Sequence, residues 1–140
     1  MKQRIVLDAW AVLALLQKEE PAASRVRQLI QDAQEGSIEL YISLVNLGEV
    51  YYRIGRVKGE KEARETLEEV RRLPLTFVPV TEEIVFAAAS LKVRYAISYA
   101  DAFAAATADR LDAAVATGDP EFAQLEECIQ IEKLERREKT

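Results

Sequence analysis

The chain has 140 residues, 49 % of them apolar, which is enough for one domain with a core of its own. Its formal net charge of −5 argues against nucleic-acid binding through bulk electrostatics. Its single cysteine excludes an internal disulfide and a cysteine metal cluster, and the absence of histidine excludes Ser-His-Asp catalysis and histidine-ligated zinc. We expect a single domain over residues 1–140 in the cytoplasm, since neither a membrane span nor a signal-type cleavage site is present.

In chain order, short apolar runs alternate with segments in which apolar residues recur at helical spacing. The predicted elements are a strand at 4–7, a helical segment at 11–16, a helix at 22–34, a strand at 39–42, a helix that starts at Ser43 and that Gly55 ends or bends, a charged surface helix at 58–72, a strand at 76–78, a helix at 81–93, an apolar helix at 98–111, a strand at 113–116 and a candidate fifth strand at 129–131.

This alternation implies a parallel sheet covered on both faces. The expected fold is therefore α/β, a three-layer α/β/α sandwich with a central, mostly parallel sheet of four to five strands. The charged tail at about 132–140 is expected to be frayed or bound to a partner.

Four carboxylates lie where such a sheet would bring them together. Asp8 and Asp119 follow apolar runs, whereas Glu49 and Asp101 lie early in helices that follow strands. Ligands bind beyond the carboxyl ends of parallel strands, where the next helices also begin. Clustered carboxylates need a cation, and their oxygens suit Mg²⁺ or Mn²⁺. Such a metal can activate water for phosphodiester hydrolysis without any histidine.

Each acid also has an ordinary structural role. A shared site explains the position of all four acids at once, whereas the ordinary roles require four independent coincidences. The roles are an N-cap for Asp8, an i,i+4 ion pair with Arg53 for Glu49, a capping-box acid after Ser98 for Asp101 and a turn residue for Asp119. The basic segment 53–64 is either a solvated helix face or an edge that contacts phosphate, with Arg53, Arg56 and Lys58 as the candidate phosphate contacts.

The ordered acids and their surroundings resemble a PIN domain, and within that family the VapC type of toxin ribonuclease. The segments that carry this resemblance are Ile5-Val6-Leu7-Asp8, Val45-Asn46-Leu47-Gly48-Glu49-Val50, Tyr99-Ala100-Asp101-Ala102 with Ala106-Thr107-Ala108, and Ala116-Thr117-Gly118-Asp119-Pro120-Glu121-Phe122.

The resemblance implies a Mg²⁺- or Mn²⁺-dependent endoribonuclease, the toxin of a toxin–antitoxin pair. It implies a small antitoxin of the VapB type as partner, a homodimer, and a structured RNA such as transfer RNA as substrate. The catalytic, metal-binding residues would be Asp8, Glu49, Asp101 and Asp119, with Thr117 as a supporting hydroxyl.

The chain departs from the family pattern directly after the first aspartate. Family members often place Ser, Thr or Asn there, whereas Ala9 and Trp10 stand here. Trp10 either stacks on a base or packs against a helix or dimer face. Two other functions stay open, a PIN-like binding or assembly module without catalysis and a housekeeping RNA-processing nuclease without an antitoxin.

Overall fold

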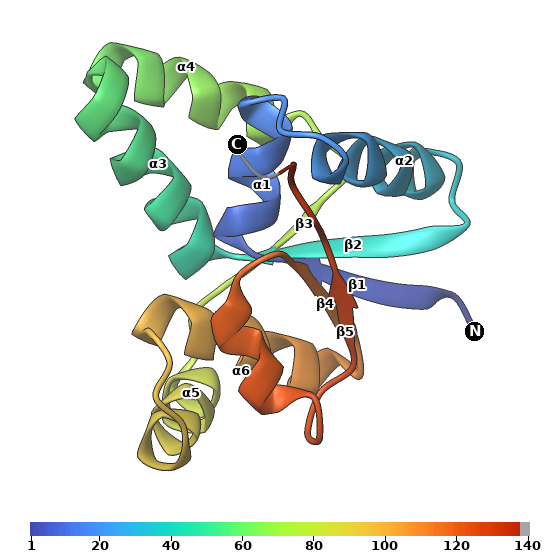
Figure 1. The fold of residues 1–140 in the computed structure, drawn as a ribbon, viewed down its shortest axis with the longest axis vertical. Helices are drawn as coiled ribbons and strands as arrows, with labels where there is room; N and C mark the ends of the chain where they lie inside the picture. The colour runs from blue at the N-terminus through green and yellow to red at the C-terminus, as the bar shows by residue number, and fades with distance from the viewer. Residues whose placement is uncertain (138–140) are drawn as a thin grey trace.

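In the computed structural model, which describes residues 1–137, five strands form one parallel sheet of order β3-β2-β1-β4-β5 (Figure 1). The strands are β1 (Gln3–Leu7), β2 (Ile38–Ser43), β3 (Thr76–Val78), β4 (Ala114–Thr117) and β5 (Ile131–Lys133). The helices are α1 (Ala9–Leu16), α2 (Ala22–Gln34), α3 (Leu44–Lys58), α4 (Glu60–Arg71), α5 (Glu82–Arg94), α6 (Tyr99–Leu111) and the 3-10 helix η1 (Pro120–Leu125).

The sheet separates two hydrophobic cores, so the expected three-layer α/β/α sandwich is confirmed. Helices α1 to α4 lie on one side of the sheet, and α5 and α6 lie on the other (Figure 1). The alternation of side chains along β1 divides its residues between the two cores, with Ile5 and Leu7 in the first and Val6 in the second. Within the described residues, no helix combines the length and the apolar character needed to cross a membrane.

Serine and threonine caps set the starts of three helices. Ser43 accepts a hydrogen bond from the Val45 backbone N–H, and Thr81 and Ser98 act in the same way for α5 and α6. Because β2 ends at Ser43 and α3 begins at Leu44, the first turn of α3 lies at the carboxyl edge of the sheet, and the Asn46 side chain donates from there to the Ala100 carbonyl in the first turn of α6, at 3.0 Å. The local sequence therefore determines where the side chains of those first turns lie.

Two expected boundaries are wrong. Helix α3 runs through Gly55 and ends at Lys58, because the break is made by Gly59, whose φ of 93° is in the left-handed region. Gly55 instead lies against α4, where an added Cβ would be 3.7 Å from the Cβ of Ala63. The fifth strand is Ile131–Lys133, two residues later than expected, since Ile129 is buried in the second core before the strand starts.

The charged tail is not frayed over the residues that the structure describes. The carboxylate of Glu132 accepts hydrogen bonds of 2.7 and 2.8 Å from the Arg25 guanidinium, and Leu134 is buried. The Leu134 backbone N–H also donates to the carbonyl of Thr117, at 2.8 Å. The expectation of a frayed tail is therefore wrong for residues 132–137, whereas binding of this tail to a partner stays a prediction, and residues 138–140 lie outside the described part of the chain.

Candidate active site

The four predicted acids all lie at the carboxyl edge of the sheet. Asp8 comes directly after β1, and Asp119 follows β4 by two residues. Glu49 is in the second turn of α3, and Asp101 is the third residue of α6. Glu49, Asp101 and Asp119 line a cleft of about 430 Å³, whereas Asp8 is buried, with 1 % of its surface exposed.

Asp8 is both a helix cap and a member of the acidic group. Its Oδ1 accepts a hydrogen bond of 2.9 Å from the Ala11 backbone N–H, and its Oδ2 accepts one of 2.5 Å from the Thr117 hydroxyl. Burial raises the pKa of Asp8 to about 7, against the lowering effect of these hydrogen bonds, and the charges of Asp119 and Glu49 raise it further. Asp8 therefore caps α1 and also interacts electrostatically with Asp119 and Glu49.

Asp101 does not complete the capping box that its position three residues after Ser98 suggested. The Ser98 Oγ accepts from the Asp101 backbone N–H at 3.1 Å, as in such a box. The reciprocal bond is different, because the Ser98 backbone N–H donates to Glu121 Oε2, at 2.8 Å. The Ser98 N–H therefore does not bind the Asp101 carboxylate, which lies beside those of Asp119 and Glu121, and the buried Oδ2 of Asp101 has no hydrogen-bond partner among the described residues. Burial, followed by the neighbouring Asp119 and Asp8 carboxylates, raises the pKa of Asp101 to about 9.

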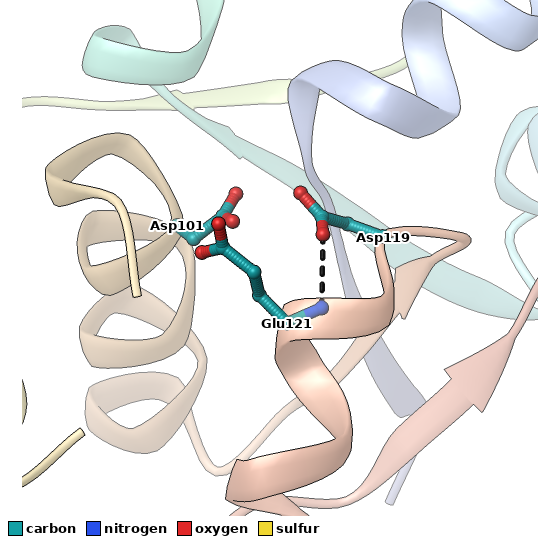
Figure 2. Close-up of side chains that lie close together, drawn as sticks. All are labelled: Asp101, Asp119 and Glu121. Carbon is teal, nitrogen blue, oxygen red and sulfur yellow. Dashed lines mark hydrogen bonds between the residues drawn. The ribbon is translucent and has the colours of Figure 1, made fainter. Parts of the chain in front are cut away.

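Glu121 is a site candidate that sequence reasoning missed. Figure 2 shows the side chains of Asp101, Asp119 and Glu121 pointing toward one another, and carboxylate oxygens from these three residues lie within 4.8 Å of each other. Asp119 caps η1 by accepting from the Glu121 backbone N–H at 2.9 Å (Figure 2). An Asp followed by Pro is a helix-start signal, which could have predicted an acid in this first turn at the same edge.

Glu49 reaches the cleft but lies outside that close group of three. Its carboxylate pairs with the Arg53 guanidinium at 2.8 Å, and its side chain is 13 % exposed. The ion pair that the sequence offered as an alternative is therefore present, in the wall of the cleft. Of the other basic candidates, Arg56 lines the cleft and Lys58 lies outside it.

Thr117 links two of the acids through its buried hydroxyl. The hydroxyl donates to Asp8 Oδ2 and accepts a hydrogen bond of 3.0 Å from the Asp119 backbone N–H. Next along the chain, Gly118 lies against the Trp10 indole so closely that an added Cβ would be 2.2 to 2.5 Å from three ring atoms. Trp10 therefore packs on the loop that carries Asp119, and it also lines the cleft.

The donor set fits a hard divalent cation. The close group offers only carboxylate oxygens, the ligands that Mg²⁺ and Mn²⁺ prefer, and neighbouring like charges raise the pKa of Asp8 and of Asp101. The buried Asp101 Oδ2 has no partner within the described chain, and a buried acceptor of this kind is unfavourable unless something binds it. A cation bound among Asp8, Asp101, Asp119 and Glu121 would offset the repulsion between these carboxylates and would give the Asp101 Oδ2 a partner.

Several solved structures with a similar fold come from toxin–antitoxin proteins. VapBC2 from Rickettsia felis, bound to a promoter DNA fragment, matches with a TM-score of 0.73 and 15 % identity over 95 % of this chain and 100 % of that one. DNA-bound VapBC from Salmonella typhimurium matches with a TM-score of 0.72 and 17 % identity, over 95 % and 98 % of the two chains. VapC20 from Mycobacterium tuberculosis, a toxin that cleaves the sarcin–ricin loop, matches with 0.69 and 18 %, over 86 % and 93 %.

A search of the curated proteins gives no match. The family model described as "PIN domain" matches residues 5–127, which include Asp8, Glu49, Asp101, Asp119 and Glu121. That match covers most of the chain. The chain belongs to the PIN domain family.

Proposed function

We propose that this protein is a Mg²⁺- or Mn²⁺-dependent endoribonuclease, the toxin of a VapC-type toxin–antitoxin pair. The observation that carries the proposal is the group of Asp101, Asp119 and Glu121, with a buried carboxylate oxygen that has no partner in the described chain. The PIN family match and the toxin folds of its structural neighbours support the same activity.

In this proposal Asp8, Asp101 and Asp119 hold the cation with Glu121, and Glu49 lies at the edge of the site. When bound, the cation would supply an activated water and neutralise charge on the RNA phosphate. The Thr117 hydroxyl holds Asp8 and Asp119 close together, since it bonds to the Asp8 carboxylate and to the Asp119 backbone N–H. The cap formed by Glu121 on the Ser98 N–H keeps the Asp101 carboxylate available.

The neighbouring complexes also indicate the partners. VapBC proteins from several bacteria were solved with their antitoxins, so we propose a small VapB-type antitoxin for this chain, and a homodimer. The proposed substrate is a structured RNA, with transfer RNA as the first to test. We further propose that residues 1–140 act as one domain in the cytoplasm.

The test is cleavage of an end-labelled transfer-RNA pool by the wild type and by Asp8→Asn, with Mn²⁺ or with EDTA. Asparagine keeps an oxygen that can accept from the Ala11 N–H, so the variant should fold while losing the charge. Asp109→Asn is the matched control, because Asp109 is exposed on α6 and outside the cleft. We expect discrete products from the wild type and the control with Mn²⁺, and none from Asp8→Asn or in EDTA.

Equal cleavage by Asp8→Asn, or cleavage that persists in EDTA, would refute the metal-dependent mechanism. Absence of cleavage by folded wild type on transfer RNA and on ribosomal RNA would favour a PIN-like binding module. If this protein cleaves RNA and no small DNA-binding protein inhibits it, a housekeeping RNA-processing nuclease would be favoured.

A further inference from the structure

The cleft beside the acids has an aromatic and basic wall from α3. Tyr52, Arg53 and Arg56 all line it, and the guanidinium carbons of Arg53 and Arg56 lie 6.0 and 5.1 Å from the centre of the Tyr52 ring. Tyr52 is 46 % exposed, so part of its ring surface is open to the cleft. An exposed aromatic ring beside cationic side chains is a surface that accepts a nucleobase and its phosphate.

The two arginines of this wall are not equivalent. Arg53 is already paired with the Glu49 carboxylate at 2.8 Å. Arg56 forms no ion pair with any carboxylate of residues 1–137, although it lines the same cleft. Arg136, which reaches the cleft from the C-terminal segment, pairs with Glu19 at 3.3 Å. Arg56 is therefore the cleft arginine whose charge a phosphate could neutralise without breaking an existing pair.

Helix α1 forms another wall of the cleft. Trp10 and Leu13 line it, and Trp10 is held in place by its close packing on Gly118. The volume of about 430 Å³ is that of a small-molecule site, which matches one nucleotide better than a duplex. The cleft also contains Asp101 and Asp119, so a nucleotide bound there would place its phosphate near the proposed metal ligands.

We propose that this cleft binds one unpaired nucleotide of the RNA, with its base stacked on Tyr52 and its phosphate paired with Arg56. The inference rests on the proposed ribonuclease function and adds to it the two side chains that would hold the nucleotide beside the scissile bond. Recognition of unstacked bases by aromatic side chains is the usual way in which proteins bind single-stranded RNA.

The chain offers its own probe, because Trp10 is its only tryptophan and lines this cleft. The titration uses a mixed-sequence 12-nucleotide single-stranded RNA in EDTA, where no cleavage occurs, and the same strand annealed to its complement. Trp10 fluorescence reports occupancy of the cleft, and the anisotropy of a fluorescein-labelled strand reports binding independently. We expect saturable quenching by the single strand and at least tenfold weaker binding of the duplex.

Variants of Tyr52 and Arg56 separate the subsite from general attraction. Tyr52→Ala should weaken binding of the single strand by about 5- to 150-fold, the range of one base–aromatic stack, and Tyr52→Phe should retain it. Arg56→Ala should weaken binding and lower the slope of log K against log salt by about 0.7, as expected for one phosphate contact on a single strand. Tyr99→Ala is the aromatic control, since Tyr99 is also 46 % exposed but outside the cleft, and Lys61→Ala is the charge control.

Unchanged binding by Tyr52→Ala, an equal loss with Tyr99→Ala, or equally tight binding of the duplex would overturn the proposal. Its failure is distinguishable from failure of the proposed function. If the wild type cuts RNA with Mn²⁺ while Tyr52→Ala binds and cuts normally, the subsite is wrong and the nuclease stands. If binding depends on Tyr52 but no RNA is cut, the subsite stands and the nuclease is wrong.

Discussion

The contact between Trp10 and Gly118 predicts whether Gly118→Ala stabilises or destabilises the protein, both with Trp10 present and with Trp10 replaced by alanine. An added Cβ at Gly118 would lie 2.2 to 2.5 Å from three atoms of the indole, whereas carbon atoms pack at about 3.5–4.0 Å. The backbone of Gly118 is not in the left-handed region, so alanine is compatible with its conformation. The free energy of unfolding should therefore fall in Gly118→Ala by about 1–3 kcal/mol, the range for overpacking, and only because of Trp10.

Removing the indole should reverse the effect. In a Trp10→Ala background the added methyl group meets no ring, and Gly→Ala at a compatible position stabilises a protein by about 0.4–1 kcal/mol through the unfolded chain. The four proteins form a double-mutant cycle with an expected coupling energy of about 1.5–4 kcal/mol. The assay is urea unfolding in EDTA. It is followed by far-ultraviolet circular dichroism because Trp10→Ala removes the only tryptophan.

The refuting result is equally specific. If Gly118→Ala has the same sign and size of effect in both backgrounds, Trp10 does not pack on this loop. The same cycle measured by RNA cleavage tests whether the packing holds Asp119, since Gly118 directly precedes it. A loss of cleavage in Gly118→Ala that Trp10→Ala restores would show that the indole displaces the loop.

Three further predictions concern the acids. Burial raises the folded-state pKa of Asp101 to about 9 and that of Asp8 to about 7, so the metal-free protein should lose stability as pH rises from about 4 toward 9. Asp101→Asn should flatten this pH dependence and raise the free energy of unfolding by at least about 1 kcal/mol at pH 8. An unchanged pH profile in urea unfolding would contradict this prediction. Mn²⁺ at 100 times its Kd should stabilise the wild type by about 2.7 kcal/mol in thermal melts, and an equal gain in Asp101→Asn would place the metal elsewhere. Glu121→Gln should keep stability but weaken Mn²⁺ binding, whereas Glu121→Ala should also lose about 1 kcal/mol, since the Ser98 N–H loses its acceptor; equal stability of the two variants would rule out the cap.

The parts of the fold that could be predicted are those that neighbouring residues determine. Ser43 and Ser98 cap their helices through bonds to residues two and three positions away, and the apolar residues of β1 alternate between the two cores. The sheet follows from the order of such elements. The placement of Asp8, Glu49, Asp101 and Asp119 at one edge needed no further information, because parallel strands and the helices after them share that edge.

The details that sequence reasoning missed depend on contacts between distant residues. Whether Asp101 completes a capping box depends on Glu121, which accepts the Ser98 N–H from 23 positions away. In the same way Leu134 is buried only because its segment returns beside β4, so its charged neighbours suggested a free tail. By contrast, the Glu49–Arg53 ion pair joins residues four positions apart on one helix, so the local pattern was enough to predict it.

The spread of the acids along the chain has a consequence for synthesis. Asp8 is made first and Glu121 more than a hundred residues later, and the cluster draws on both. A nascent chain therefore carries no complete set of these acids until Glu121 has left the ribosome, and β5 still has to pair with β4 after that. If the protein cuts RNA as proposed, the ribosome that makes it is not exposed to its activity until translation of the domain is nearly finished.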